Sequence, residues 1–232
     1  MIGVPGQQRI GQPAEPDQPA AHRAVGQEKR LDAAWHDKIG HVGAVGVEKR
    51  RRVEIGHAPK IGSARAYRYH AGMHETQEIR LRPAETDDAG AIAGLIRAAF
   101  AGPAETTDPK PSALRESAES VAATLGVGGG AVVELGTALV GAVLWQPRDG
   151  GLYFGRLAVA PACQGRGIAR QLLAEVEAEA QRRGLSRLLL STRLVWTGNR
   201  RLFTSLGFVE TAQHAHPGYD APTFVDMEKA LV

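Results

Sequence analysis

The sequence predicts an α+β domain with a mixed, mostly antiparallel sheet and flanking helices, preceded by a disordered N-terminal tail. Three observations lead to this fold class. From residue 78 onward, short apolar runs rich in β-formers alternate with amphipathic helical stripes. Two hairpin signals follow each other closely, at Gly136-Thr137 and at 149–151. A glycine-rich segment, residues 164–167, then opens the longest helical pattern of the chain.

The first predicted elements are one strand and two helices. Residues 78–83 alternate polar and apolar side chains, which is typical of a half-buried strand. Asp87 and Asp88, both good N-cap residues, precede an apolar stripe at helical spacing. Residues 112–125 repeat this plan, and Gly126 is expected to end the second helix.

The remaining elements complete the order βααβββαβαββ. The helix that follows the glycine-rich segment carries an apolar stripe with a spacing of four residues, and Gly184 is expected to end it. The expected elements are, in order, strands 131–135, 138–145 and 152–159, a helix that ends at Arg183, a strand over 185–194, a helix over 198–206, a strand from Phe208 and a strand over 223–231.

The composition is that of a soluble globular protein. Of 232 residues, 43% are hydrophobic and 23% are charged, and no apolar run approaches the ~20 residues of a membrane span. The N-terminus lacks the apolar core of a secretion signal, and the only cysteine, Cys163, fits a reducing compartment. Five of the eight histidines precede Met73, at spacings that match no zinc site. We therefore expect a cytoplasmic protein with no membrane partner and no metal.

The first 72 residues differ from the rest of the chain. They carry 12 Lys and Arg against 7 Asp and Glu, and they show no sustained helical or strand period. The basic run 49–52 lacks the interleaved aromatic residues of a single-strand-binding groove. We interpret residues 1–72 as a low-order basic tail that binds no nucleic acid, and 73–232 as the folded domain. Because the composition changes at Met73, we hypothesise that the protein truly starts there.

The glycine-rich segment predicts an anion site. Gly165 and Gly167 stand at the start of an amphipathic helix, where glycine costs roughly 1 kcal/mol against alanine. Backbone N–H groups at a helix N-terminus have no intrahelical partner, and the helix dipole attracts negative charge to them. Arg166 and Arg170 add positive charge. A P-loop is excluded because no lysine follows Gly167, and a dinucleotide-binding loop is disfavoured because Arg170 replaces its third glycine.

A third anion-binding pattern fits better. Gln164, Gly167 and Ala169 satisfy the signature Q/R-x-x-G-x-G/A, and they follow a predicted strand that ends in 157–159. Pro161 lies between the two, and Leu206-Gly207-Phe208 ends a later helix. In this order and at these distances, the motifs resemble the GNAT superfamily of N-acetyltransferases over residues 78–232.

The resemblance implies a fold and a cofactor site. Acetyl-coenzyme A would lie in an opening between two splayed parallel strands, here 152–159 and 185–194. Its pyrophosphate would bind the backbone N–H groups of the glycine-rich segment, and its pantetheine arm would pair with the strand that ends in Val159. The residues implied in cofactor binding are Leu157, Ala158, Val159, Gln164, Gly165, Arg166, Gly167, Ile168, Ala169, Arg170, Asn199 and Phe203.

The catalytic residues do not follow from the resemblance. Many members of the family place a tyrosine four residues before the glycine of the LGF ending, as the acid that protonates the departing thiolate. Here that position is Phe203, so water would have to supply the proton. The candidate bases are Glu134 and Tyr153, with His214 and His216 as further options, and each of them also has an ordinary structural interpretation.

Two functions remain open at this stage. The first is an N-acetyltransferase that moves an acetyl group from acetyl-coenzyme A to a primary amine by direct attack in a ternary complex. The alternative is a non-catalytic acyl-coenzyme A sensor with the same fold, because Phe203 removes the usual acid. For the enzyme, the acceptor would be a small-molecule amine or an amine of a peptide or protein. We expect a monomer or a homodimer.

Overall fold

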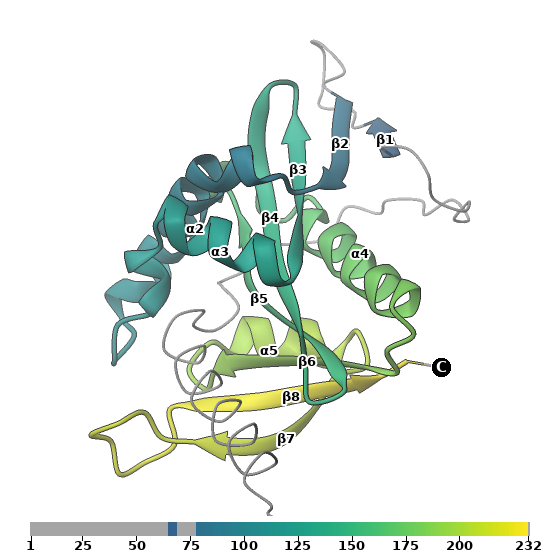
Figure 1. The fold of residues 1–232 in the computed structure, drawn as a ribbon. Helices are drawn as coiled ribbons and strands as arrows, with labels where there is room; N and C mark the ends of the chain where they lie inside the picture. The colour runs from purple at the N-terminus through teal and green to yellow at the C-terminus, as the bar shows by residue number, and fades with distance from the viewer. Residues whose placement is uncertain (1–64, 69–77, 232) are drawn as a thin grey trace, which may run out of the picture. The chain divides into compact units, whose positions relative to one another are not determined.

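One mixed sheet of eight strands forms the centre of the computed structural model, which describes residues 65–68 and 78–231 (Figure 1). The strand order is β1-β2-β3-β4-β5-β6-β8-β7, and of the pairs in this part of the chain only β5–β6 is parallel. The strands are β1 (Arg65–Arg68), β2 (Glu78–Pro83), β3 (Gly129–Leu135), β4 (Ala138–Arg148), β5 (Gly151–Val159), β6 (Arg187–Arg193), β7 (Val209–His214) and β8 (Phe224–Ala230).

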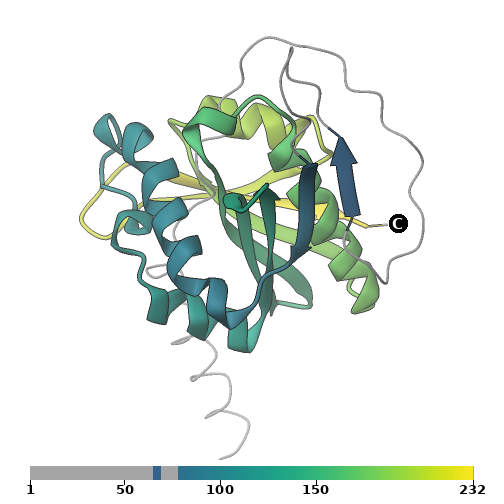
Figure 2. The ribbon, with the colours of Figure 1, turned by 90° about the horizontal axis from the view of Figure 1, so that it is seen from above.

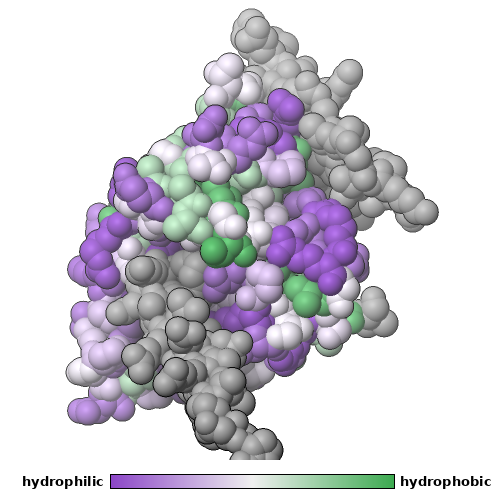
Figure 3. Space-filling view, viewed as in Figure 1, coloured by the Kyte–Doolittle hydropathy of each residue, from purple (hydrophilic) through white to green (hydrophobic). Residues whose placement is uncertain are grey.

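Helices cover both faces of the sheet. Figure 2 shows α2 (Ala89–Glu105) and α3 (Ala118–Val127) on one side and α4 (Ile168–Arg182) on the other. A shorter helix, α5 (Thr197–Thr204), follows β6. Hydrophilic side chains cover the outer side of α4, whereas hydrophobic residues gather over α2 and α3 (Figure 3). This arrangement confirms the predicted α+β class with a mixed sheet and flanking helices.

Strand alternation divides the core into two layers. Successive side chains of a strand point to opposite faces, so each strand supplies both layers. In β4, Val143 packs with the layer under α4 and α5, whereas Ala142 and Leu144 pack under α2 and α3. In β5, Phe154 belongs to the first layer and Ala158 to the second. The sheet is therefore buried on both faces where β4 and β5 cross its middle.

The turns and the end of α4 form as the sequence predicts. Asp149 and Gly150 both have positive φ, 48° and 72°. A two-residue hairpin turn requires this when its twist matches that of the flanking strands. Gly184 has a φ of 67°, and the N–H of Leu185 donates to the carbonyl of Ala180 at 2.9 Å. This bond and the one from Gly184 to Gln181 form a Schellman motif, which explains why the helix stops there.

The second predicted helix, 112–125, was wrong at both ends. Ser112–Arg115 form a separate 3-10 turn, and Glu116 is extended, with φ −63° and ψ 134°. Ser117 then caps α3, since its hydroxyl accepts the N–H of Ser120 at 3.2 Å. Gly126 lies inside the helix, and Gly128 is its C-cap. Position 128 requires glycine because a Cβ there would lie 1.9 Å from a backbone oxygen of β4.

The structure describes only a small part of the predicted N-terminal tail. Most of residues 1–72 lie outside the described residues, and so does the predicted boundary at Met73. One strand that the sequence did not predict, β1, falls within this segment and pairs antiparallel with β2. Within residues 65–68 and 78–231, no helix has the length and hydrophobicity that a membrane span needs.

Candidate functional site

The parallel strands β5 and β6 separate after a short contact. They pair only at Leu152–Leu188 and Tyr153–Leu189, although β5 continues to Val159 and β6 to Arg193. The sheet therefore opens toward the C-terminal ends of both strands, as the predicted fold requires. Strand edges inside a sheet normally pair, and an unpaired edge exposes a row of backbone donors and acceptors.

A β-bulge in β5 accounts for this opening. Ala142 of β4 faces Ala158, but Leu144 faces Gly155, so two residues of β5 lie opposite one residue of β4. Arg156 occupies the bulge with a φ of +52°, which is uncommon for a residue with a side chain. A bulge bends its strand and increases its twist, and here it turns the end of β5 away from β6.

The backbone of β5 presents hydrogen-bonding groups to the opening. The N–H of Ala160 donates to Val140 of β4 at 2.8 Å. Because strand backbone groups alternate in direction, those of Leu157 and Val159 point the other way, toward β6. The side-chain amide of Gln164 donates to the carbonyl of Val159 at 3.3 Å. The structure thus places three of the predicted cofactor residues at one edge.

The glycine-rich segment lies between β5 and α4. Gly165 and Gly167 have φ values of +74° and +80°, and Gly167 is the N-cap of α4. A Cβ at either glycine would meet no atom within 4 Å, so the backbone conformation, rather than protein packing, requires glycine. Arg170 is the first residue of α4 whose N–H donates within the helix, to Gly167 at 3.0 Å. The N–H groups of Ile168 and Ala169 are therefore left for another acceptor.

Two further predicted cofactor residues lie close to this helix start. Arg166 lies in the segment itself and is partly buried, whereas Arg170 is exposed and donates to the hydroxyl of Ser205 at 3.3 Å. This contact joins the first turn of α4 to the end of α5. Positive charge from Arg166 and Arg170 thus accompanies the helix dipole at the predicted anion site.

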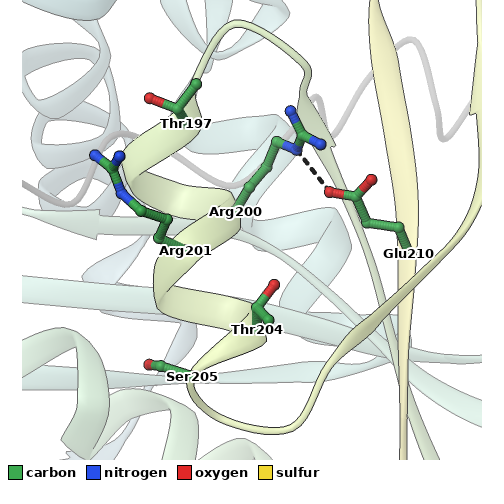
Figure 4. Close-up of a pocket in the computed structure, with 6 residues that line it drawn as sticks. All are labelled: Thr197, Arg200, Arg201, Thr204, Ser205 and Glu210. Carbon is green, nitrogen blue, oxygen red and sulfur yellow. Dashed lines mark hydrogen bonds and ion pairs between the residues drawn. The ribbon is translucent and has the colours of Figure 1, made fainter.

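A pocket of about 440 Å³ lies along α5, which the sequence did not predict. Arg200 and Glu210 form an ion pair of 2.6 Å on one side of the helix, and Arg201 points away from that pair (Figure 4). The lining residues are Thr197, Arg200, Arg201, Thr204, Ser205 and Glu210. Because Arg170 contacts Ser205, this basic surface adjoins the start of α4.

Phe203 and Asn199 are both buried in α5. The ring of Phe203 is fully buried and packs edge-on against Phe154 and Phe208, with centroid distances of 6.2 and 5.8 Å. Asn199 lies near the start of the helix and is 2% exposed. The structure thus places Phe203 in an aromatic core cluster, and its contact with a cofactor stays a prediction. Its ring carries no proton that could protonate a thiolate.

The two candidate bases differ in their surroundings. Glu134 lies in β3, where its carboxylate pairs with Arg82 at 2.7 Å, and Arg82 also binds Asp88. Glu134 thus has the partners of a structural ion pair. Tyr153 lies in β5 at the last position that pairs with β6, and it is 4% exposed. Burial raises the pKa of its hydroxyl, which therefore stays protonated near neutral pH.

A hydrogen-bonded chain connects Tyr153 with the strands beyond β6. The Tyr153 hydroxyl is hydrogen-bonded to Ser191, and Ser191 donates to a carboxylate oxygen of Asp226 at 2.5 Å. The other oxygen of Asp226 lies 2.8 Å from Nε2 of His214, whose side chain is 44% exposed. The chain crosses from β5 through β6 and β8 to β7 on the face opposite α4. Of its four members, the sequence suggested only Tyr153 and His214.

The opened strand pair and the helix N-terminus beside it define an α+β protein whose central sheet opens next to unpaired backbone N–H groups. Residues 92–208 match the family model of the acetyltransferase (GNAT) family. The chain belongs to this family, as the motifs from Leu157 to Phe208 predicted.

Solved structures share this fold at low sequence identity. The ribosomal-protein-S18-alanine N-acetyltransferase of Escherichia coli is 20% identical, with a TM-score of 0.54 over 66% of this chain and 94% of its own. The PaiA N-acetyltransferase of Thermoplasma acidophilum, solved with coenzyme A, is 15% identical, with a TM-score of 0.55 over 66% and 98%. YncA of Salmonella typhimurium, assigned as an acetyltransferase and solved with its cofactor acetyl-CoA, is 24% identical, with a TM-score of 0.51 over 66% and 94%. None of the curated proteins compared with this chain matches it.

Proposed function

We propose that the protein is an N-acetyltransferase that moves an acetyl group from acetyl-coenzyme A to a primary amine by direct attack in a ternary complex. The observation that carries this proposal is the unpaired edge of β5 beside the open N-terminus of α4. The edge suits a ligand with amide groups, and the helix start suits a pyrophosphate. Coenzyme A contains both groups, since its amide-bearing pantetheine arm is joined directly to its pyrophosphate.

The residues around the opening fit this ligand. The hydroxyl of Thr192, in the part of β6 that does not pair with β5, is buried and has no hydrogen-bond partner among the described residues. Like Leu188 and Leu190, it lies on the α4 side of the strand by alternation. Buried polar atoms normally have partners, so Thr192 and the edge at Leu157 and Val159 favour a polar ligand in the opening. Acetyl-coenzyme A supplies the acetyl group as a thioester.

For the removal of the amine proton we propose the chain from Tyr153 to Asp226. An alkylammonium ion has a pKa of about 10.4, so most of the acceptor is protonated at pH 7 and must lose that proton before it can attack. Ser191 donates to Asp226 and can accept from Tyr153, which aligns the donors in one direction. The Asp226 carboxylate ends this chain as the proton acceptor, with His214 bound to its second oxygen.

Asp226→Asn is expected to lower kcat/KM for amine acetylation at pH 7 by about 100-fold, the lower end of the range of general base catalysis. The loss should shrink as the pH rises toward 10, because the acceptor then loses its proton to solvent. A pH–rate profile of both proteins measures this. Glu228→Gln, two residues away on the same face of β8, is the matched control. If Asp226→Asn lowers kcat/KM by the same factor at every pH, the chain from Tyr153 to Asp226 does not remove the amine proton.

The alternative function, a non-catalytic acyl-coenzyme A sensor, is favoured by Phe203, since the usual acid is missing. The two functions are separated by measuring the release of free thiol from acetyl-coenzyme A with a panel of small amines and amine-bearing peptides. We expect turnover with at least one acceptor class. Tight binding of acetyl-coenzyme A without turnover on any amine would favour the sensor.

A further inference from the structure

Arg193 is a buried cation at the edge of the opening. It is the last residue of β6, beyond Leu189, where pairing with β5 ends, and it is 2% exposed. Ionised side chains are rarely buried to this extent unless an opposite charge is bound to them. Burial lowers the pKa of Arg193 to about 10, so the guanidinium remains a cation near neutral pH.

Arg193 lacks a counter-ion among the described residues. No carboxylate of these residues lies within 4 Å of its guanidinium, and its buried Nε has no hydrogen-bond partner. Its one hydrogen-bonding contact there is from Nη1 to Nδ1 of His216, at 3.2 Å. Arginine can only donate, so this contact does not neutralise its charge.

The surroundings of Arg193 belong to two loops. His216 and Tyr219 lie in the β7–β8 loop, and Asp108 lies in the segment between α2 and α3. Asp108 attracts Arg193 without forming an ion pair with it, and the Asp108 carboxylate accepts a hydrogen bond from the Tyr219 hydroxyl. Arg193 therefore faces the α2–α3 side of the sheet, opposite the start of α4.

We propose that Arg193 binds an anionic group of the acceptor, so that the substrate class is amines that carry a carboxylate or a phosphate. This inference rests on the proposed acetyltransferase function. A planar guanidinium with a free Nε donates two parallel hydrogen bonds to such oxyanions, and these bonds are stronger away from water. The anion would supply the missing counter-charge and hold the amine at a fixed distance from the opening.

The test compares matched acceptors that differ in one charge. Alanine and alaninamide test the carboxylate, and phosphoethanolamine and ethanolamine test the phosphate. We expect the wild-type protein to favour at least one anionic member by about 10- to 100-fold in kcat/KM. Arg193→Met should abolish this preference, and Arg193→Lys should keep part of it. The amino group of alaninamide has a lower pKa than that of alanine, so a larger share of it is unprotonated near neutral pH. This difference favours alaninamide, and a preference for alanine would therefore arise in spite of it.

Stability measurements separate this role from a structural one. Arg193→Met removes an uncompensated buried charge, so its melting temperature should be unchanged or higher. Asp108→Asn is the control, because it removes a negative charge that attracts Arg193 and should leave the preference for anionic acceptors intact. If Arg193→Met and Asp108→Asn both destabilise the fold equally and leave acceptor preference unchanged, Arg193 is a structural residue.

Binding without turnover keeps the two proposals distinct. Each acceptor is titrated by calorimetry into the full-length protein saturated with coenzyme A, which cannot donate an acetyl group. Stronger binding of an anionic member that Arg193→Met abolishes supports the anion site even if no amine is acetylated. Equal affinities within both pairs would overturn the anion site, and amine turnover in the same protein would leave the acetyltransferase function standing.

Discussion

Gly167→Asp is expected to weaken the binding of acetyl-coenzyme A by about 1,000-fold. The new carboxylate would stand at the N-cap of α4, beside the N–H groups of Ile168 and Ala169 that are left for a pyrophosphate. Two unit charges about 4 Å apart interact by about 4 kcal/mol at an effective dielectric constant near 20, which corresponds to this loss in affinity. The added Cβ would occupy the open space in front of the helix.

The same substitution should leave the protein folded. The φ of +80° at Gly167 is a left-handed conformation that Asp and Asn adopt more readily than other residues. No protein atom lies within 4 Å of the new Cβ, so no clash follows. A carboxylate near a helix N-terminus contributes about 0.3–1 kcal/mol of stability, which offsets part of the backbone strain. Affinity and stability are therefore expected to change independently.

Gly167→Asn is the matched control, because asparagine has nearly the same shape and no charge. Calorimetric titration with acetyl-coenzyme A should give a much smaller loss for Asn than for Asp, and thermal melting should give similar midpoints for both. Equal affinities of the wild type and the Asp variant would show that the pyrophosphate does not bind at α4.

Most elements of the fold follow from local patterns in the sequence. The stripe of α4, the hairpin glycines and the stop at Gly184 each depend on residues close together in the chain, and the structure confirms them. The break at Glu116 was missed because an apolar stripe continued across it, although Ser117 and Ser120 form a capping box. A local cap signal outweighed the helical period there.

The site was harder to predict because it depends on strand register and on strain. Ser191 and Asp226 are register partners of β6 and β8, 35 residues apart, and no local pattern shows which residues of two strands meet. The bulge depends on a positive φ at Arg156, where the sequence contains an arginine rather than a glycine. The missing counter-ion of Arg193 is likewise a property of the packed loops around it.

Glu116→Gln is expected to destabilise the protein by about 3–5 kcal/mol, the cost of leaving one member of a buried ion pair without its partner. Glu116 is bound to Nε of Arg156, and the two side chains are 4% and 0% exposed. Burial lowers the pKa of Arg156, and Glu116 is the charge that opposes this effect. Because Arg156 occupies the bulge, the pair also links the segment between α2 and α3 to the bulged part of β5.

Thermal melting measures this loss as a fall of about 6–20 °C, since 1 kcal/mol shifts the midpoint by roughly 2–4 °C in a chain of this size. Glu210→Gln is the control, because its pair with Arg200 is about 30% exposed and contributes at most about 1 kcal/mol. Replacing both partners, by Arg156→Met with Glu116→Gln, should recover part of the loss, since no unpaired charge then remains buried. If Glu116→Gln melts no lower than Glu210→Gln, the guanidinium of Arg156 reaches another partner or solvent, and the ion pair does not hold the bulge in place.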